Sequence, residues 1–247
     1  MAKPGILDQL SAKGADISAI ADRFIKNSKQ IPLLIEAVRT EKSSKKFAYE
    51  KTLRLISERE PGLIYPYFDV CIGLLDSENS FLKWGSIITV ANLTTVDAEK
   101  KFETVFKKYY APICGPAMIT AANIIGSSVI IARAKPDLVN SITNEILKVE
   151  KARFLRKGIP SPECRNVVIG QAIDSLDKFY DRISDKASVV KFVKCQLKNT
   201  RMQVVKKAEK FLKKHVPSKD TLDQKKSAGS RLKRITGSGF SRRQKTI

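Results

Sequence analysis

The stretch Ser161–Phe179, "SPECRNVVIGQAIDSLDKF", has the features of one complete helix. Ser161 is a good N-cap, and Pro162 falls at the first helical position, where its missing N–H costs nothing. Behind them, small or apolar residues recur about every fourth position: Cys164, Val168, Ala172 and Leu176. One such stripe predicts an amphipathic helix with a single buried face.

The same spacing recurs four more times along the chain of 247 residues. The matching sets are Ser44, Ala48, Thr52 and Leu55; Leu82, Ser86, Val90 and Leu93; Cys114, Met118, Ala122 and Ile125; and Thr200, Val204, Ala208 and Phe211. Successive sets start 38, 32, 50 and 36 residues apart, so an insertion precedes the set at Cys164. This period predicts an all-α solenoid of about five antiparallel helix pairs behind a short N-terminal capping pair.

The periodicity also sets the domain boundaries. We expect the repeat domain at residues 16–215, with residues 1–15 as a lead-in that forms part of the cap. From Val216 onward the apolar period stops, and residues 216–247 are rich in Ser, Gly, Lys and Arg. Because such a segment buries too little apolar surface to offset its ordering entropy, we expect a disordered basic tail.

An uncharged run from Ala111 to Ala132 permits two interpretations. A membrane span needs about 20 apolar residues, but prolines, glycines and an asparagine interrupt this run. The central inner helix of a solenoid is packed on both sides and is therefore apolar nearly all round. We favour the inner helix and expect Ala122→Glu to be severely destabilising.

The polar residues do not form a known catalytic or metal-binding motif. The cysteines (Cys71, Cys114, Cys164 and Cys195) lack CxxC spacing, and the single His215 cannot complete a metal cluster. We interpret the four cysteines as buried reduced thiols. No GxGxxG, P-loop or HExxH motif occurs, so we expect neither cofactor nor metal and lean away from an enzyme. The N-terminus lacks the apolar core of a signal peptide, which predicts a cytoplasmic protein.

The net charge of +21 lies mostly in the last quarter of the chain. Residues 186–215 contain ten basic residues and one acidic residue, and residues 216–247 contain nine and two. An excess of this size favours an acidic partner, either nucleic acid or an acidic protein.

The candidate binding residues are the basic side chains of four segments. The first helix of the fifth pair carries Lys191, Lys194 and Lys198. Its second helix carries Arg201, Lys206, Lys207, Lys210, Lys213 and Lys214. The insertion places Lys151, Arg153, Arg156 and Lys157 around Phe154, a pattern that either grips a phosphate backbone and stacks on a base or tucks the ring against the scaffold. The tail adds Lys225, Lys226, Arg231, Lys233, Arg234, Arg242 and Arg243.

The helix-pair period, the small residue four positions into each stripe and the basic residue after its start resemble the HEAT/armadillo-type helical repeats. Asp76 and Lys83 resemble the Asp and Lys/Arg positions of a HEAT turn, whereas Gly115 departs from the basic pattern. The resemblance covers residues 16–215. It implies a right-handed superhelix whose second helices line the concave face, and it does not imply a particular ligand.

Three functions remain open. The first is a binding module for DNA or RNA, and the second is a scaffold for an acidic protein segment. The third is an enzyme that resembles the helical-repeat DNA glycosylases, for which Trp84 with Tyr65, Tyr67 and Asp69 is the local candidate site. The sequence leaves the oligomeric state and the cellular process open.

Overall fold

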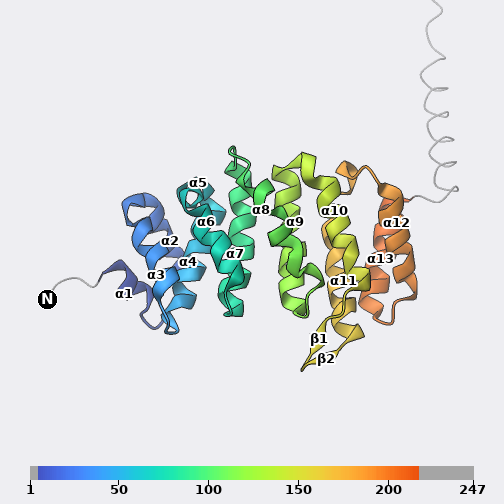
Figure 1. Cartoon of the computed structure of the whole chain (residues 1–247), viewed down its shortest axis with the longest axis horizontal. Coiled ribbons are helices and arrows are strands. Elements are labelled where there is room, and N and C mark those ends of the chain that lie inside the picture. The colour runs from blue at the N-terminus through green and yellow to red at the C-terminus, as the bar shows by residue number, and fades with distance from the viewer. Residues whose placement is uncertain (1–4, 217–247) are drawn as a thin grey trace, which may run out of the picture.

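The computed structural model describes residues 5–216 as a stack of antiparallel helix pairs (Figure 1). Two short helices, α1 (Ile6–Leu10) and α2 (Ile17–Lys26), precede the regular pairs. The first helices of the pairs are α3 (Ile31–Thr40), α5 (Pro61–Ile64) with α6 (Phe68–Gly73), α8 (Lys101–Tyr110), α10 (Val139–Leu147) and α12 (Lys186–Cys195). The second helices are α4 (Lys45–Arg59), α7 (Ser80–Leu93), α9 (Met118–Ala134), α11 (Pro162–Asp177) and α13 (Met202–His215). The predicted all-α array is confirmed.

Short 3-10 turns carry the chain between these helices. They are η1 (Ser28–Gln30), η2 (Tyr65–Tyr67), η3 (Leu74–Asp76), η4 (Thr94–Val96), η5 (Ala111–Cys114), η6 (Pro136–Leu138), η7 (Lys148–Lys151), η8 (Tyr180–Arg182) and η9 (Gln196–Lys198).

The insertion between α10 and α11 forms a small hairpin, which is the one departure from the predicted all-α structure among residues 5–216. Strands β1 (Leu155–Arg156) and β2 (Ile159–Pro160) pair in antiparallel fashion. The two loop residues, Lys157 and Gly158, have φ values of 52° and 79°. A two-residue hairpin loop prefers two positive φ angles, because that turn matches the twist of the strands.

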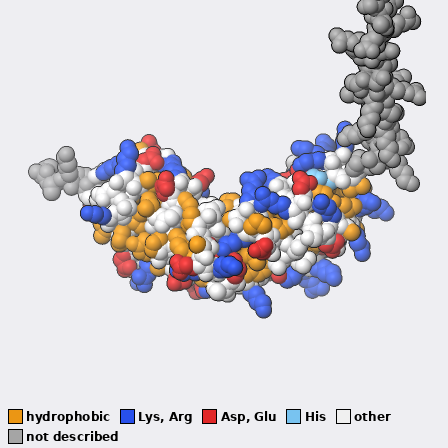
Figure 2. Space-filling view, turned by 90° about the horizontal axis from the view of Figure 1, so that it is seen from above, with side chains coloured by type: hydrophobic (Ala, Val, Ile, Leu, Met, Phe, Trp, Pro, Cys, Tyr) orange, Lys and Arg blue, Asp and Glu red, His pale blue; other side chains and the backbone are white. Residues whose placement is uncertain are grey.

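The second helices line the concave face of the stack. Each packs directly against the next, from α4 through α7, α9 and α11 to α13, whereas the first helices of neighbouring pairs contact one another far less. A stack bends toward its more closely spaced layer, and Figure 2 shows the resulting crescent, hollowed on one side.

The predicted stripes are confirmed in α7 and α11, where all eight of their residues are buried. In α9 the predicted register was wrong for all but Ile125, which is fully buried. Met118 and Ala122 are only half-buried, whereas Ala121 and Ile124 are fully buried. The turn before α9 is longer than we assumed, so Cys114 lies exposed in η5 and outside the helix. Cys195 is also exposed, and only Cys71 and Cys164 are the buried thiols expected.

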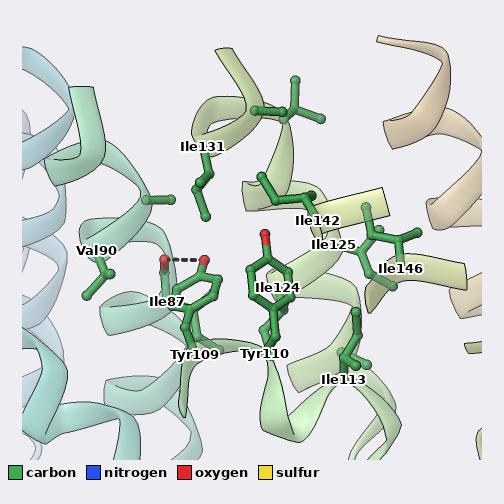
Figure 3. Packing of buried hydrophobic residues seen from close by; sticks show 14 of the residues in the cluster. Ile87, Val90, Tyr109, Tyr110, Ile113, Ile124, Ile125, Ile131, Ile142 and Ile146 are labelled. Carbon is green, nitrogen blue, oxygen red and sulfur yellow. Dashed lines mark hydrogen bonds between the residues drawn. The ribbon is translucent and has the colours of Figure 1, made fainter. Parts of the chain in front are cut away.

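The uncharged run packs at the centre of the molecule (Figure 3). Tyr109 and Tyr110 of α8 insert among isoleucines of α7, α9 and α10, and both side chains are 1% exposed. Their hydroxyls keep hydrogen-bond partners, because Tyr109 donates to the Ile87 carbonyl over 2.9 Å and Tyr110 lies 2.9 Å from Ser128 Oγ. Among residues 5–216, no helix is both long and apolar enough to cross a membrane.

Polar contacts join neighbouring pairs at the period seen in the sequence. Asn92 donates to Ser57 across 35 positions, and Asn166 donates to Thr200 across 34. Asp76 contacts Lys108 of the next pair at 2.7 Å, across 32 positions, whereas the resemblance to a HEAT turn singled out Lys83. Equivalent positions of adjacent repeats therefore face one another.

Asp97 is the most fully bonded of these polar groups. Its carboxylate accepts the Tyr65 hydroxyl at 2.6 Å, the Lys135 ammonium at 2.9 Å and the amides of Lys101 and Phe102. It thus caps α8 from a position four residues before the helix begins. Burial on its own would raise the pKa of Asp97, but these hydrogen bonds together lower it.

Candidate functional site

Helix α13 closes the C-terminal end of the described array, and one of its faces is neutralised by α11. Lys207 Nζ lies 2.5 Å from Asp174, and Lys214 Nζ lies 2.8 Å from Asp177. Asp177 also contacts His215 Nε2 at 2.6 Å. Burial opposes ionisation of Asp177, but hydrogen bonds from Lys214 and His215 lower its pKa. These two lysines therefore serve the contact between repeats.

An adjoining face of α13, opposite its buried side, carries a row without such partners. Lys206, Lys210 and Lys213 are exposed, and they form no ion pair with any residue of the described chain 5–216. They lie one helical turn apart, at spacings of about 6 and 4.5 Å along the axis. Val204, Ala208 and Phe211 bury the other side of the helix, so the row projects away from the core. We call it the α13 row.

The second predicted row lies on a different layer. Lys191, Lys194 and Lys198 are exposed on α12 and η9, which belong to the outer layer. Lys191 borders a shallow pocket with Glu150 and Cys195 on the side of α10. The structure therefore does not bring this α12 row and the α13 row together into one site.

Arg201 has a structural partner. Its guanidinium bonds the Glu163 carboxylate at the start of α11 and also reaches Gln203. The contact joins the N-terminal ends of α11 and α13, so this arginine contributes less free charge than the sequence count suggests.

Phe154 is not available for stacking. Its side chain is 0% exposed, which contradicts its assignment as a binding residue. The ring anchors the insertion, and the Leu155 amide donates to the Pro116 carbonyl over 2.9 Å. The basic residues around it (Lys151, Arg153, Arg156 and Lys157) are all exposed. The hairpin instead presents Leu155 and Ile159 to solvent, at 38% and 69% exposure.

The predicted tail residues, from Lys225 to Arg243, lie outside the described part of the chain. The sequence alone supports their contribution.

Sequence reasoning missed an apolar groove at the N-terminal ends of the second helices. Its volume is about 550 Å³, and it lies between the hairpin and the first turns of α7, α9, α11 and α13. The lining includes Trp84, Met118, Ile119, Leu155 and Val167, with Arg156 beside them. The sequence did contain one indication of this groove. Most second helices have an apolar residue in the first turn that does not belong to the predicted buried stripe.

The residues proposed for a flipped base do not converge. The Tyr65 hydroxyl is bonded to Asp97, whereas the Trp84 indole N–H donates to Thr120 Oγ1 at 3.0 Å. Asp69, the candidate carboxylate, is exposed on the first helix α6, whereas Trp84 lies on the second helix α7. The structure thus places the ring and its candidate carboxylate on different layers. Within residues 5–216, no group of His, Cys, Asp and Glu is arranged to hold a metal ion.

No protein-family model matches the chain, and no curated protein matches its sequence. Among solved structures, it is similar to the designed armadillo repeat protein YIII(Dq.V1)4CPAF in complex with the peptide (KR)4. That alignment has a TM-score of 0.51 and 11% identity, and it covers 84% of this chain and 97% of that chain. An engineered protein aligns with a TM-score of 0.44 and 12% identity over 84% of this chain and 86% of its own. The fold is an armadillo/HEAT-like helical repeat.

Proposed function

We propose that the chain is a binding scaffold that holds nucleic acid at the basic end of its concave face. The observation that carries this proposal is the α13 row of Lys206, Lys210 and Lys213, exposed and without carboxylate partners in the described chain. Lysines that serve only as a solvated cap are usually mixed with acidic residues, and Glu209 is the single acid on this helix.

The spacing of the row suits an extended polyanion. Steps of about 4.5–6 Å along α13 are close to the phosphate repeat of an extended single strand. Side chains on a rigid helix fix the register of the nucleic-acid backbone that they contact. The nine basic residues of 216–247 add positive charge, which strengthens binding equally for every base sequence.

The designed armadillo protein offers a comparison of charge. That protein was solved with (KR)4, a basic peptide. In this chain the terminal second helix is itself basic, so electrostatics favour a ligand of the opposite sign on the corresponding surface. An acidic protein segment is the alternative ligand, because it satisfies the same charges and a protein of similar fold was solved with a peptide.

Titration of the full chain with fluorescent ligands separates these alternatives. The ligands are a single-stranded DNA, a single-stranded RNA and a duplex, each of about 20 nucleotides, and a poly-glutamate peptide of equal charge. The proposal predicts that nucleic acid binds more tightly than poly-glutamate. Tighter binding of the peptide would assign the row to an acidic protein, and no binding of any of the four would contradict both.

A further inference from the structure

Exposed apolar side chains of the described chain gather on one edge of the molecule. Of ten large apolar residues that are exposed, six lie on the hairpin or in the first turns of second helices: Phe47, Phe81, Ile119, Leu155, Ile159 and Met202. Single exposed apolar residues are normal, but a contiguous group indicates an interaction surface.

The groove on this edge is built from fixed parts. The indole of Trp84 is oriented by its hydrogen bond to Thr120 and by an edge-to-face contact with Phe81, whose ring centre lies 5.4 Å away. Phe81 in turn meets Phe47 of α4 at 5.3 Å. On the opposite side, the buried Phe154 and the bond from Leu155 to Pro116 hold the hairpin as a wall. A preformed groove spares a ligand part of the cost of ordering the site.

The charged rim of the groove is positive. Arg156 lines it, is exposed and has no ion pair within residues 5–216, and Lys157 follows in the hairpin turn. Glu163, which also lines the groove, is already engaged by Arg201. The first turn of α9 has no side-chain cap, so its free amides add to the positive potential. A ligand with carboxylates beside its apolar part complements this rim.

We propose that the groove docks a short segment of a partner protein in which one or two large apolar side chains are flanked by carboxylates. Met118, Ile119, Leu155 and Val167 form an aliphatic lining that grips a side chain, and Trp84 is the one aromatic ring among the described lining residues, whereas stacking of successive bases uses several such rings. This surface lies at the helix N-termini, so its ligand is independent of the one proposed for the α13 row.

A peptide array with the full chain tests this proposal. The probes are peptides of about 12 residues that carry two Leu or Phe at spacings of two, three or four, flanked by Glu. Matched peptides replace Glu by Lys or the apolar pair by Ser. We expect binding of Glu-flanked apolar peptides alone. Trp84 is the single tryptophan of the chain, so its fluorescence reports occupation of the groove directly.

Three variants assign the binding to the groove. Ile119→Glu and Arg156→Glu should each weaken the best peptide at least tenfold. The matched control is Leu33→Glu on α3, because Leu33 is similarly exposed, at 55% against 46% for Ile119, and lies in the outer layer. It should leave the affinity unchanged. Circular dichroism checks that each variant is folded.

Five outcomes would overturn the proposal. The first three are equal binding of Lys-flanked peptides, no peptide binding, and an affinity that Ile119→Glu leaves unchanged. A response of Trp84 to single-stranded DNA that Ile119→Glu abolishes would assign the groove to bases. Concentration-dependent dimerisation of the free chain that Ile119→Glu removes would assign it to a second copy.

Discussion

Helix α13 presents two sets of lysines that the sequence does not distinguish. Lys207 and Lys214 reach Asp174 and Asp177 of α11 and neutralise them, whereas Lys206, Lys210 and Lys213 face away from α11 and keep their charge unpaired. The first set joins repeats, and the second is available to a ligand. A count of basic residues therefore overstates the binding surface, and partners one repeat away decide which charges are free.

The largest effect is expected where an ion pair between repeats is buried. Asp97 is 5% exposed, and its carboxylate forms an ion pair with Lys135. Asp97→Ala removes one of the two carboxylates that pair with the Lys135 ammonium, leaving Glu103 at 3.1 Å, and it also removes the cap of α8. We therefore expect the free energy of unfolding to fall by about 3 kcal/mol. Urea denaturation at neutral pH measures it. The control is Asp76→Ala, which removes an exposed pair with Lys108 and should cost less than about 1 kcal/mol. Equal losses would contradict a structural role for buried pairs.

The pH dependence of the Asp97 contribution follows from its lowered pKa. The contribution is present above the pKa of the unfolded chain and is lost as the pH falls through the folded value. The difference between wild type and Asp97→Ala should therefore shrink in acid.

The junction of α4 and α7 is the counterexample, because the carboxyl group of Glu50 there has one ion pair, with Arg54 at 3.6 Å, and one oxygen without a hydrogen bond. Glu50 is 9% exposed, and its Oε1 has no hydrogen bond. It packs against Gly85, where an added Cβ would lie 1.6 Å from that oxygen. Burial raises the pKa of Glu50 to about 7, although the positive charges of Arg54 and Lys51 act to lower it. Its neutral form therefore stabilises the fold below about pH 4.5, and this stability is lost as the pH rises through 7.

Glu50→Gln should consequently stabilise the protein in alkaline but not in acidic buffer. We expect the free energy of unfolding to increase by about 2 kcal/mol at a pH well above the raised pKa of Glu50. Well below the pKa of an ordinary glutamate we expect little change. Thermal unfolding at the two pH values measures the difference. A gain of the same size at both would mean that the charge of Glu50 is not responsible.

The smallest expected effect concerns the paired face of α13. Asp174→Asn together with Asp177→Asn releases Lys207 and Lys214 and removes two negative charges near the α13 row. We expect about threefold tighter binding of single-stranded DNA in anisotropy titrations, with a stability loss of about 1 kcal/mol or less. Weaker binding by the folded variant would mean that the ion pairs position the row rather than compete with it.

The sequence predicted the features that depend on local periodicity. Helices α7 and α11 bury the predicted stripes, because a 3.6-residue repeat of apolar residues has few other ways to leave water. It did not predict the register of α9, and it left open whether Phe154 is buried, since both depend on which neighbour packs against them. The hairpin carried a local signal, Lys157-Gly158, which was too short to stand out within the insertion.

The candidate site was less predictable for the same reason. The free state of Lys206 and the paired state of Lys207 are set by α11, 33 residues earlier for the bond to Asp174. The apolar groove is assembled from four second helices and the hairpin, so no single stretch contains its pattern.

The measurement that tests the central claim most directly is the salt dependence of single-stranded DNA binding. It compares wild type with Lys206, Lys210 and Lys213 replaced by Ala, and with the matched control in which Lys191, Lys194 and Lys198 are replaced. Each phosphate contact to a single strand contributes about 0.7 to the slope of log K against log salt. We predict that the slope falls by about 2 in the α13 variant and stays unchanged in the α12 variant. Equal changes in both, or none in either, would contradict a defined binding row on the concave face.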